Sequence, residues 1–162
     1  MRCARLSLIA LLIAAGGIAV AQERKADVVK DAIFARKILM DSINNNMDEI
    51  EGMISSGKPI PMDEAREHAD LISVMLMAFP HLFPDSTNQW KPNVQRDPGT
   101  DTFAAPAVWT NFADFYDRAA KASKTAYNAS RAKTEGDFKS FAKQLRESCD
   151  SCHAAYQKTS EQ

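Results

Sequence analysis

Apolar residues between positions 26 and 55 recur in steps of three and four, and this spacing constrains the fold more than any other feature of the chain. They form one seam: Val29, Ile33, Met40, Ile43, Met47, Ile50 and Ile54. Such steps place side chains along one face of an α-helix that packs in a bundle. The run Ser55-Ser56-Gly57-Lys58-Pro59 then ends the helix, because glycine and proline commonly follow helix C-termini.

Three further segments show the same helical spacing, at about 63–79, 107–131 and 137–158. Their seams are Ala65, Ala69, Ile72, Leu76 and Phe79 in the first; Val108, Phe112, Phe115, Ala119, Ala122 and Ala126 in the second; and Phe138, Phe141, Leu145, Cys149, Cys152 and Tyr156 in the third. Only 6 residues are Gly, and no alternating apolar pattern of useful length indicates a strand. An all-α protein is therefore expected.

A long irregular stretch, 80–106, separates the second predicted helix from the third. It is rich in proline, asparagine and aspartate, but Phe83, Trp90 and Phe103 give it apolar side chains with which to pack. A loop of this length inside a compact domain usually has a function or lies against the domain. We expect a four-helix bundle with short first and last connections and one long crossover between helices 2 and 3.

The first 21 residues have the pattern of a secretory signal peptide. Arg2 and Arg5 form a basic start, residues 6–20 are apolar, and Ala19-Val20-Ala21 is a small-residue cleavage site. The apolar run is shorter than the roughly 20 residues of a membrane-spanning helix. Cleavage after Ala21 is expected, leaving a single domain at 22–162, exported to the periplasm and not attached to the membrane.

Removal of residues 1–21 changes the charge and the cysteine content. Of the 162 residues 141 remain, with 18 basic and 21 acidic side chains, so the formal net charge is −3. With no long basic run, nucleic acid is excluded as a partner. Cys3 is lost with the leader, whereas Cys149 and Cys152 stay as a pair.

The pair belongs to the motif Cys149-Asp150-Ser151-Cys152-His153, which matches the C-x-x-C-H pattern of covalent haem attachment. Positions i, i+3 and i+4 share one face of a helix, so both thiols and the imidazole point the same way. The thiols can add to the two vinyl groups of one haem, and His153 can then ligate the iron.

Two other interpretations of the cysteine pair remain open. An oxidising compartment permits a disulfide between Cys149 and Cys152. A thioredoxin-like redox pair, however, belongs to a βαβ fold and lies at a helix N-terminus, whereas this motif lies near a helix end. A structural zinc site needs four ligands, and the mature chain adds only His68 and His81 to the motif.

Arg36 places a charge on the apolar seam of the first helix, where burial without a partner is costly. Either its guanidinium reaches solvent while its stem packs, or it meets an anion inside the bundle. Two haem propionates would provide that anion, because arginine pairs well with carboxylates. Met40, one turn later, either fills a core gap or lies over the open face of the haem.

Other candidate groups are less informative. His68 and His81 are each possible distal ligands, but surface or half-buried positions are expected for both. Four aromatic residues are candidates for packing against a ring, although aromatic seam positions usually belong to the core: Trp109, Phe112, Phe115 and Tyr156. We find no nucleophile–base arrangement and no paired carboxylates in a recognisable setting, so the chain is not expected to be an enzyme.

Several motifs of the chain resemble the cytochrome c′ family, the class II c-type cytochromes. Ala35-Arg36 with Met40 resembles the family's first-helix arginine and the bulky distal residue four positions later. Gly57-Lys58-Pro59 resembles the first inter-helix turn, and the segment from Pro106 to Phe115 resembles the opening of the third helix. The segment from Cys149 to Tyr156 resembles the haem motif with its trailing tyrosine.

The resemblance covers essentially all of the mature chain and implies a left-handed antiparallel bundle, usually a homodimer through the first two helices. It also implies one covalent haem c whose iron is five-coordinate and high-spin, and which binds nitric oxide and carbon monoxide. By position, Arg36 and Lys37 would contact the haem edge, with Thr102 or Phe103 contributing from the crossover. Met40 would crowd the distal face without ligating the iron.

Two positions depart from the family pattern. Gln157 stands where the family often has arginine on the proximal side, and Lys37 where it often has glutamine. The expectation is a periplasmic mono-haem protein with five-coordinate, high-spin iron that binds nitric oxide or carbon monoxide, transfers single electrons, or does both. The alternatives are a six-coordinate, low-spin electron carrier with Met40 as the sixth ligand, and a thiol-disulfide protein without haem.

Overall fold

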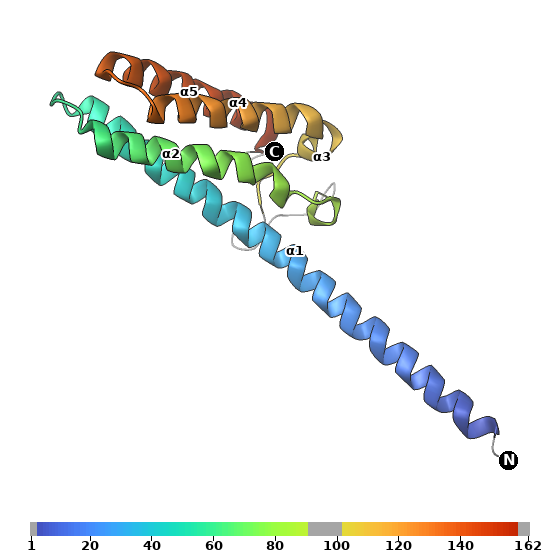
Figure 1. Cartoon of the computed structure of the whole chain (residues 1–162). Coiled ribbons are helices and arrows are strands. Elements are labelled where there is room, and N and C mark those ends of the chain that lie inside the picture. Colours follow the sequence, from blue (N-terminus) through green and yellow to red (C-terminus); the bar gives the residue numbers. More distant parts are fainter. Residues whose placement is uncertain (1–2, 91–101, 159–162) are drawn as a thin grey trace.

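The computed structural model describes residues 3–90 and 102–158, with side chains from Asp27 onward. Four long helices account for most of it: α1 (Cys3–Ser55), α2 (Met62–Ala78), α4 (Phe112–Ser130) and α5 (Glu135–Tyr156). Helix α2 packs against α1 and α4, and α4 packs against α5. Successive long helices run in opposite directions, and the C-terminal half of α1 completes the bundle (Figure 1). The predicted four-helix bundle is confirmed.

Helix α1 is much longer than the other helices. It continues without a break from the predicted leader, through Ala21, into the bundle. Its N-terminal part projects away from α2, α4 and α5 (Figure 1). Within the parts of the chain that the structure describes, none of the helices is both long enough and apolar enough to cross a membrane.

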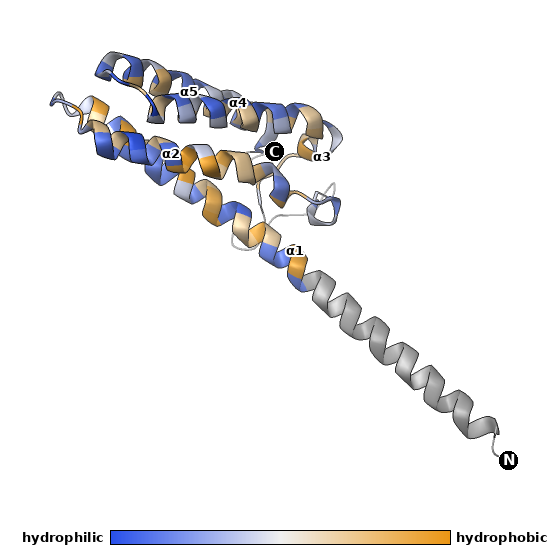
Figure 2. Ribbon diagram, viewed as in Figure 1, coloured by the Kyte–Doolittle hydropathy of each residue, from blue (hydrophilic) through white to orange (hydrophobic). Residues whose placement is uncertain are grey.

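The principal core lies where α1 and α4 end and α5 begins, and it includes residues from most of α2. Apolar and polar residues alternate along α1 and α2 at helical spacing (Figure 2). The largest fully buried apolar side chains are Met47, Ile50, Ile72, Phe138 and Leu145. Their faces meet inside the bundle, and burial of each such side chain contributes about 1.5–3 kcal/mol relative to exposure.

Small residues let α2 and α4 approach closely. Ala65 and Ala69 of α2 and Ala126 of α4 are fully buried. Ser123 Oγ donates to the Ser73 carbonyl oxygen over 2.8 Å, which satisfies a hydroxyl buried between the two helices. This close contact fixes the positions of α2 and α4, and both helices line the pocket described below.

The segment between α2 and α4 is partly ordered into short helical turns. A 3₁₀ turn, Phe79–Leu82, follows α2 directly, with Pro80 buried in it, and a second 3₁₀ turn, Asp85–Thr87, comes shortly after. The short helix α3 (Ala107–Thr110) then precedes α4. The single helix predicted at 107–131 is thus divided, because Asn111 has non-helical dihedral angles (φ −130°, ψ 44°) and turns the chain.

Individual residues stabilise the two short connections, from α1 to α2 and from α4 to α5. Gly57 has φ +70°, a left-handed conformation that glycine adopts without steric cost, in the turn from α1 to α2. Thr134 Oγ1 accepts a hydrogen bond from Asp137 N at 3.1 Å and caps α5. Across the bundle, Arg146 of α5 donates to both carboxylate oxygens of Glu51 of α1, at 2.6 and 2.9 Å.

Candidate haem-binding site

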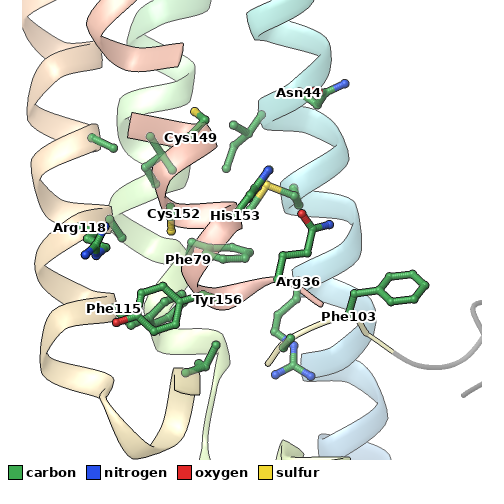
Figure 3. Close-up of a pocket in the computed structure, with 18 of the residues that line it drawn as sticks. Arg36, Asn44, Phe79, Phe103, Phe115, Arg118, Cys149, Cys152, His153 and Tyr156 are labelled. Carbon is green, nitrogen blue, oxygen red and sulfur yellow. The ribbon is translucent and has the colours of Figure 1, made fainter. Parts of the chain in front are cut away.

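A pocket of about 460 Å³ lies among α1, α2, α4, α5 and the end of the crossover. This volume is within the range of ligand pockets, about 300–1,000 Å³. Its walls are mostly apolar and include Ile43, Met47, Leu76, Val108, Ala119 and Ala122. The candidate haem-binding residues reach it from α1, α5 and the crossover (Figure 3).

Cys149, Cys152 and His153 lie together on the pocket wall that α5 provides. Both cysteines are free and half-buried. Burial raises the pKa of each thiol. Burial also lowers the pKa of the His153 imidazole, which favours the neutral form that binds metals. In Figure 3 the His153 ring extends from α5 toward α1.

Arg36 is 2% exposed and lies at the crossover end of the same pocket. Its Nη1 donates to Thr87 Oγ1 over 3.1 Å, and its Nη2 donates to Thr102 Oγ1 over 3.4 Å. The guanidinium carbon lies 4.4 Å from the centre of the Phe83 ring. Burial lowers the Arg36 pKa to about 10, so the side chain stays charged at neutral pH.

The remaining predicted contacts also line the pocket. Lys37 and Met40 do so from α1, and Thr102 and Phe103 from the end of the crossover. The Phe103 ring, however, points away from the motif on α5 (Figure 3). Met40 is half-buried and is not among the side chains that pack into either apolar cluster of the described chain.

The other two histidines lie outside the pocket. His68 is half-buried, and its Nδ1 lies 2.8 Å from Asn46 Oδ1. His81 is exposed, with its ring 5.9 Å from the Tyr116 ring. Among the described residues, no group of three or more histidine, cysteine, aspartate or glutamate side chains is arranged to hold a metal ion.

A second apolar cluster closes the pocket beside the cysteine motif. Phe83, Val108, Phe115 and Tyr156 are its buried members, and Cys152 packs against it. The ring centres of Phe83 and Phe115 are 4.9 Å apart, and those of Phe115 and Tyr156 are 5.2 Å apart. Such edge-to-face contacts favour one arrangement of the rings, and they make this wall of the pocket apolar.

Two residues of the site were not found from the sequence. Thr87 is 1% exposed and holds the guanidinium of Arg36. Arg118 lines the pocket from α4 and pairs with Asp114 over 2.6 Å. The i, i+4 spacing of Asp114 and Arg118 indicates a helix ion pair, but no signal in the sequence connects either residue to α5.

The residues present fit a covalently attached haem. Two thiols and one imidazole occupy the same wall of an apolar pocket, which is the donor set that the haem group requires. At the other end, Arg36 Nε is a buried nitrogen that has no hydrogen-bond partner in the described chain. A buried cation with an unsatisfied donor suits an anionic group such as a propionate.

Comparison with known proteins identifies the family. The family model for cytochrome c′ matches residues 31–157, which include the C-terminal half of α1, the other helices and the haem motif. The chain belongs to the cytochrome c′ family. As a member it carries haem c, with iron, and falls among haem proteins of electron transfer and gas binding. A cytochrome c-556 from Agrobacterium tumefaciens (strain B2A) is 31% identical over 124 residues, covering 75% of this chain and 92% of that protein.

Solved structures of cytochromes have the same fold. Cytochrome c′ from Shewanella frigidimarina superposes with a TM-score of 0.68 at 20% identity, covering 81% of this chain and 97% of that one. R. palustris cytochrome c556 superposes with a TM-score of 0.66 at 23% identity, covering 80% and 98%. At these identities the likeness shows that the bundle is the cytochrome c′ fold.

Proposed function

We propose that the chain is a periplasmic mono-haem cytochrome that carries single electrons, in which His153 and Met40 would both ligate the iron. The observation that carries the proposal is the position of Met40. It lies on the α1 wall of the pocket, outside both apolar clusters, while His153 extends toward α1 from α5. A thioether that lies outside these clusters, on the wall toward which the imidazole extends, suits the methionine–histidine ligation of many c-type cytochromes.

The cysteine motif would attach the cofactor to the protein covalently. Thioether bonds from Cys149 and Cys152 would fix the cofactor to α5, and both residues line the pocket with free thiols. A haem bound in this way supplies reversible one-electron chemistry of its iron. The apolar walls exclude water, and second contacts around the ligands tune the reduction potential.

Arg36 would hold the anionic edge of the cofactor. It has one donor without a partner, and it is held by Thr87 and Thr102 at the end of the pocket where the crossover returns. Lys37 adds a second cationic side chain to the same end. Arg36 and Lys37 would therefore hold the propionate groups, and Cys149 and Cys152 would bond to the vinyl groups.

A second candidate function is the binding of nitric oxide or carbon monoxide at a five-coordinate iron. The match to the cytochrome c′ family supports it, since the resemblance noted above implies an open distal side. In that case Met40 would crowd the distal face without ligating. The two candidates differ in one bond, from Met40 to the iron.

Absorption and magnetic circular dichroism spectra of the purified holoprotein distinguish the candidates. Electron carriage with Met40 as ligand predicts low-spin spectra with a methionine-to-iron charge-transfer band in the ferric state. In Met40→Leu the band should vanish, the iron should become high-spin, and carbon monoxide should bind readily to the ferrous protein. Met53→Leu, a half-buried methionine outside the pocket, is the matched control. A high-spin spectrum in the unaltered protein would contradict the Met40 ligation and favour gas binding.

A homodimer through α1 and α2 is also proposed. Large apolar side chains are exposed on both helices, among them Phe34 and Ile38 of α1 and Leu71 and Val74 of α2. A contiguous exposed apolar face usually marks an interaction surface. Sedimentation equilibrium should give twice the mature mass, and Val74→Lys together with Ile38→Lys should give the monomer. A monomeric unaltered protein would refute the dimer.

A further inference from the structure

One carboxylate oxygen of Asp114 on α4 accepts two hydrogen bonds. Tyr156 Oη donates to Asp114 Oδ2 over 2.5 Å, and Arg118 Nε donates to the same oxygen over 2.6 Å. Tyr156 comes from the last turn of α5, 42 residues further along the chain. One acidic side chain of α4 is therefore bonded to the end of the helix that bears the cysteine motif.

Arg118, which pairs with Asp114, also holds α5 within the motif. Arg118 Nη1 donates to Ser151 Oγ over 3.0 Å. Ser151 precedes Cys152 and His153, and Tyr156 follows them by less than one turn. Thus Arg118 contacts α5 inside the motif, between its two cysteines, and Asp114 contacts it immediately after the motif.

Tyr156 makes further contacts through its ring, its hydroxyl group and its carbonyl oxygen. It is 5% exposed, and its ring packs against Phe115 of α4. Asn111 Nδ2 donates to Tyr156 Oη over 3.3 Å. The Tyr156 carbonyl oxygen accepts from Ala105 N over 2.8 Å, and Lys158 N donates to the Phe103 carbonyl oxygen over 2.7 Å. The returning crossover is thereby joined to the end of α5.

The electrostatics agree with this arrangement. The hydrogen bonds from Tyr156 and Arg118 lower the pKa of the Asp114 carboxyl, so the carboxylate form persists at neutral pH. A charged acceptor makes these bonds stronger than neutral ones. Elsewhere on α5, Glu51 of α1 holds Arg146, three residues before Cys149. A charged contact thus joins α5 to α1 before the motif. Charged side chains of α4 contact α5 within the motif and just after it.

We propose that Asp114 is a positioning residue for the haem site, which sets the orientation of Cys152 and His153 by holding Ser151 and Tyr156 against α4. This inference rests on the proposed function, because it assigns Asp114 to the haem that the cysteine motif binds. Asp114 itself does not line the pocket. It acts through Tyr156 directly and through Arg118 to Ser151.

Tyr156→Phe in the full-length holoprotein is the primary test. The substitution removes the donor to Asp114 but keeps the ring against Phe115 and changes no charge. We expect the ferric electron paramagnetic resonance lines to shift and broaden as the His153 ring takes more than one orientation. Amide hydrogen exchange at Ala105, Gln157 and Lys158 should become about tenfold faster, because a bond to a charged acceptor is lost. Asp114→Asn should give the same changes, and the double variant should add little to either.

Asp117→Asn is the matched control. Asp117 lies on the same helix and pairs with Lys121 over 2.5 Å, but both side chains are largely exposed and neither lines the pocket. Its spectrum and exchange rates should equal those of the unaltered protein. If Tyr156→Phe and Asp114→Asn lower the melting temperature but keep the original spectrum and exchange rates, the inference is wrong. An unaltered protein that carries no haem would instead refute the proposed function.

Discussion

Arg36 Nη1 donates a hydrogen bond to Thr87 Oγ1 over 3.1 Å, although the two residues are 51 positions apart. Thr87 Oγ1 in turn donates to the Pro84 carbonyl oxygen over 2.7 Å. Both side chains are almost fully buried. This pair therefore joins α1 to the start of the crossover, and it does so at the end of the pocket where an anionic group is expected.

Thr87→Val should destabilise the fold. The variant has nearly the same shape but leaves a buried guanidinium donor without its partner, which costs about 1–3 kcal/mol in the free energy of unfolding. Chemical denaturation of the purified holoprotein measures the change. Thr87→Ser keeps the hydroxyl and should recover much of the loss.

Thr125→Val provides the matched comparison. Thr125 Oγ1 donates only to the Lys121 carbonyl oxygen within its own helix, over 3.1 Å. Its replacement should change the free energy of unfolding by less than about 0.5 kcal/mol. Equal effects at the two threonines would show that the contact with Arg36 contributes nothing to stability.

Met40→Leu should lower the reduction potential. A thioether ligand stabilises the ferrous state relative to the ferric state. Its loss should lower the midpoint potential by on the order of 100 mV, a fraction of the roughly 0.8 V range that axial ligands span. Spectroelectrochemistry gives the value directly. An unchanged potential would mean that Met40 does not bind the iron.

The arrangement of the long helices was predictable because each seam repeats over several turns. Ile33, Ile43, Met47 and Ile50 are buried as their spacing predicts. Arg36, for which a solvent-exposed and a buried guanidinium were both open, is buried as well. Helix ends and breaks were less predictable. Asn111 divides the third predicted helix, and no residue pattern on either side signals the turn. The continuation of α1 back to Cys3 was likewise not expected from the seam that begins at Val29.

The thiols of the apoprotein should react slowly at neutral pH. Burial raises the pKa of Cys149 and of Cys152 above the ordinary value of 9.0, so little thiolate is present at pH 7. The rate of alkylation by iodoacetamide should keep rising with pH beyond 9 in the folded apoprotein. Urea-unfolded chain should follow the ordinary thiol profile, and identical profiles would contradict the burial of the two thiols.

The raised pKa values of the two thiols also make the stability of the apoprotein depend on pH. Folding favours the protonated thiols, so the folded chain binds more protons than the unfolded chain at alkaline pH. The free energy of unfolding should therefore fall as the pH rises through the ordinary thiol pKa and beyond. Replacement of both cysteines by serine should remove this part of the alkaline destabilisation.

The mature protein should begin at Gln22. Cleavage after Ala21 would remove the part of α1 that includes Cys3 and leave the 141 residues that follow. N-terminal sequencing or intact mass of the periplasmic protein measures this. A start at Met1 in an exported, membrane-bound form would show that the leader is retained as an anchor.

The members of the site were predictable in part. The cysteine motif specifies its own face of α5, and Arg36 stands out as a charge on an apolar seam. Thr87 and Arg118 could not be found, because their roles depend on contacts with α1 and α5 that are remote in sequence. The crossover brings Thr102 to Arg36 for the same non-local reason.

The measurement that tests the central claim most directly is the intact mass of the protein after expression in cells that mature c-type cytochromes. The account predicts one haem added to the peptide that contains both Cys149 and Cys152, with the mass surviving denaturation. It also predicts that replacing both cysteines by serine abolishes the covalent addition. A colourless protein whose mass equals that of the polypeptide, or is lower by the two hydrogens of a disulfide, would contradict it.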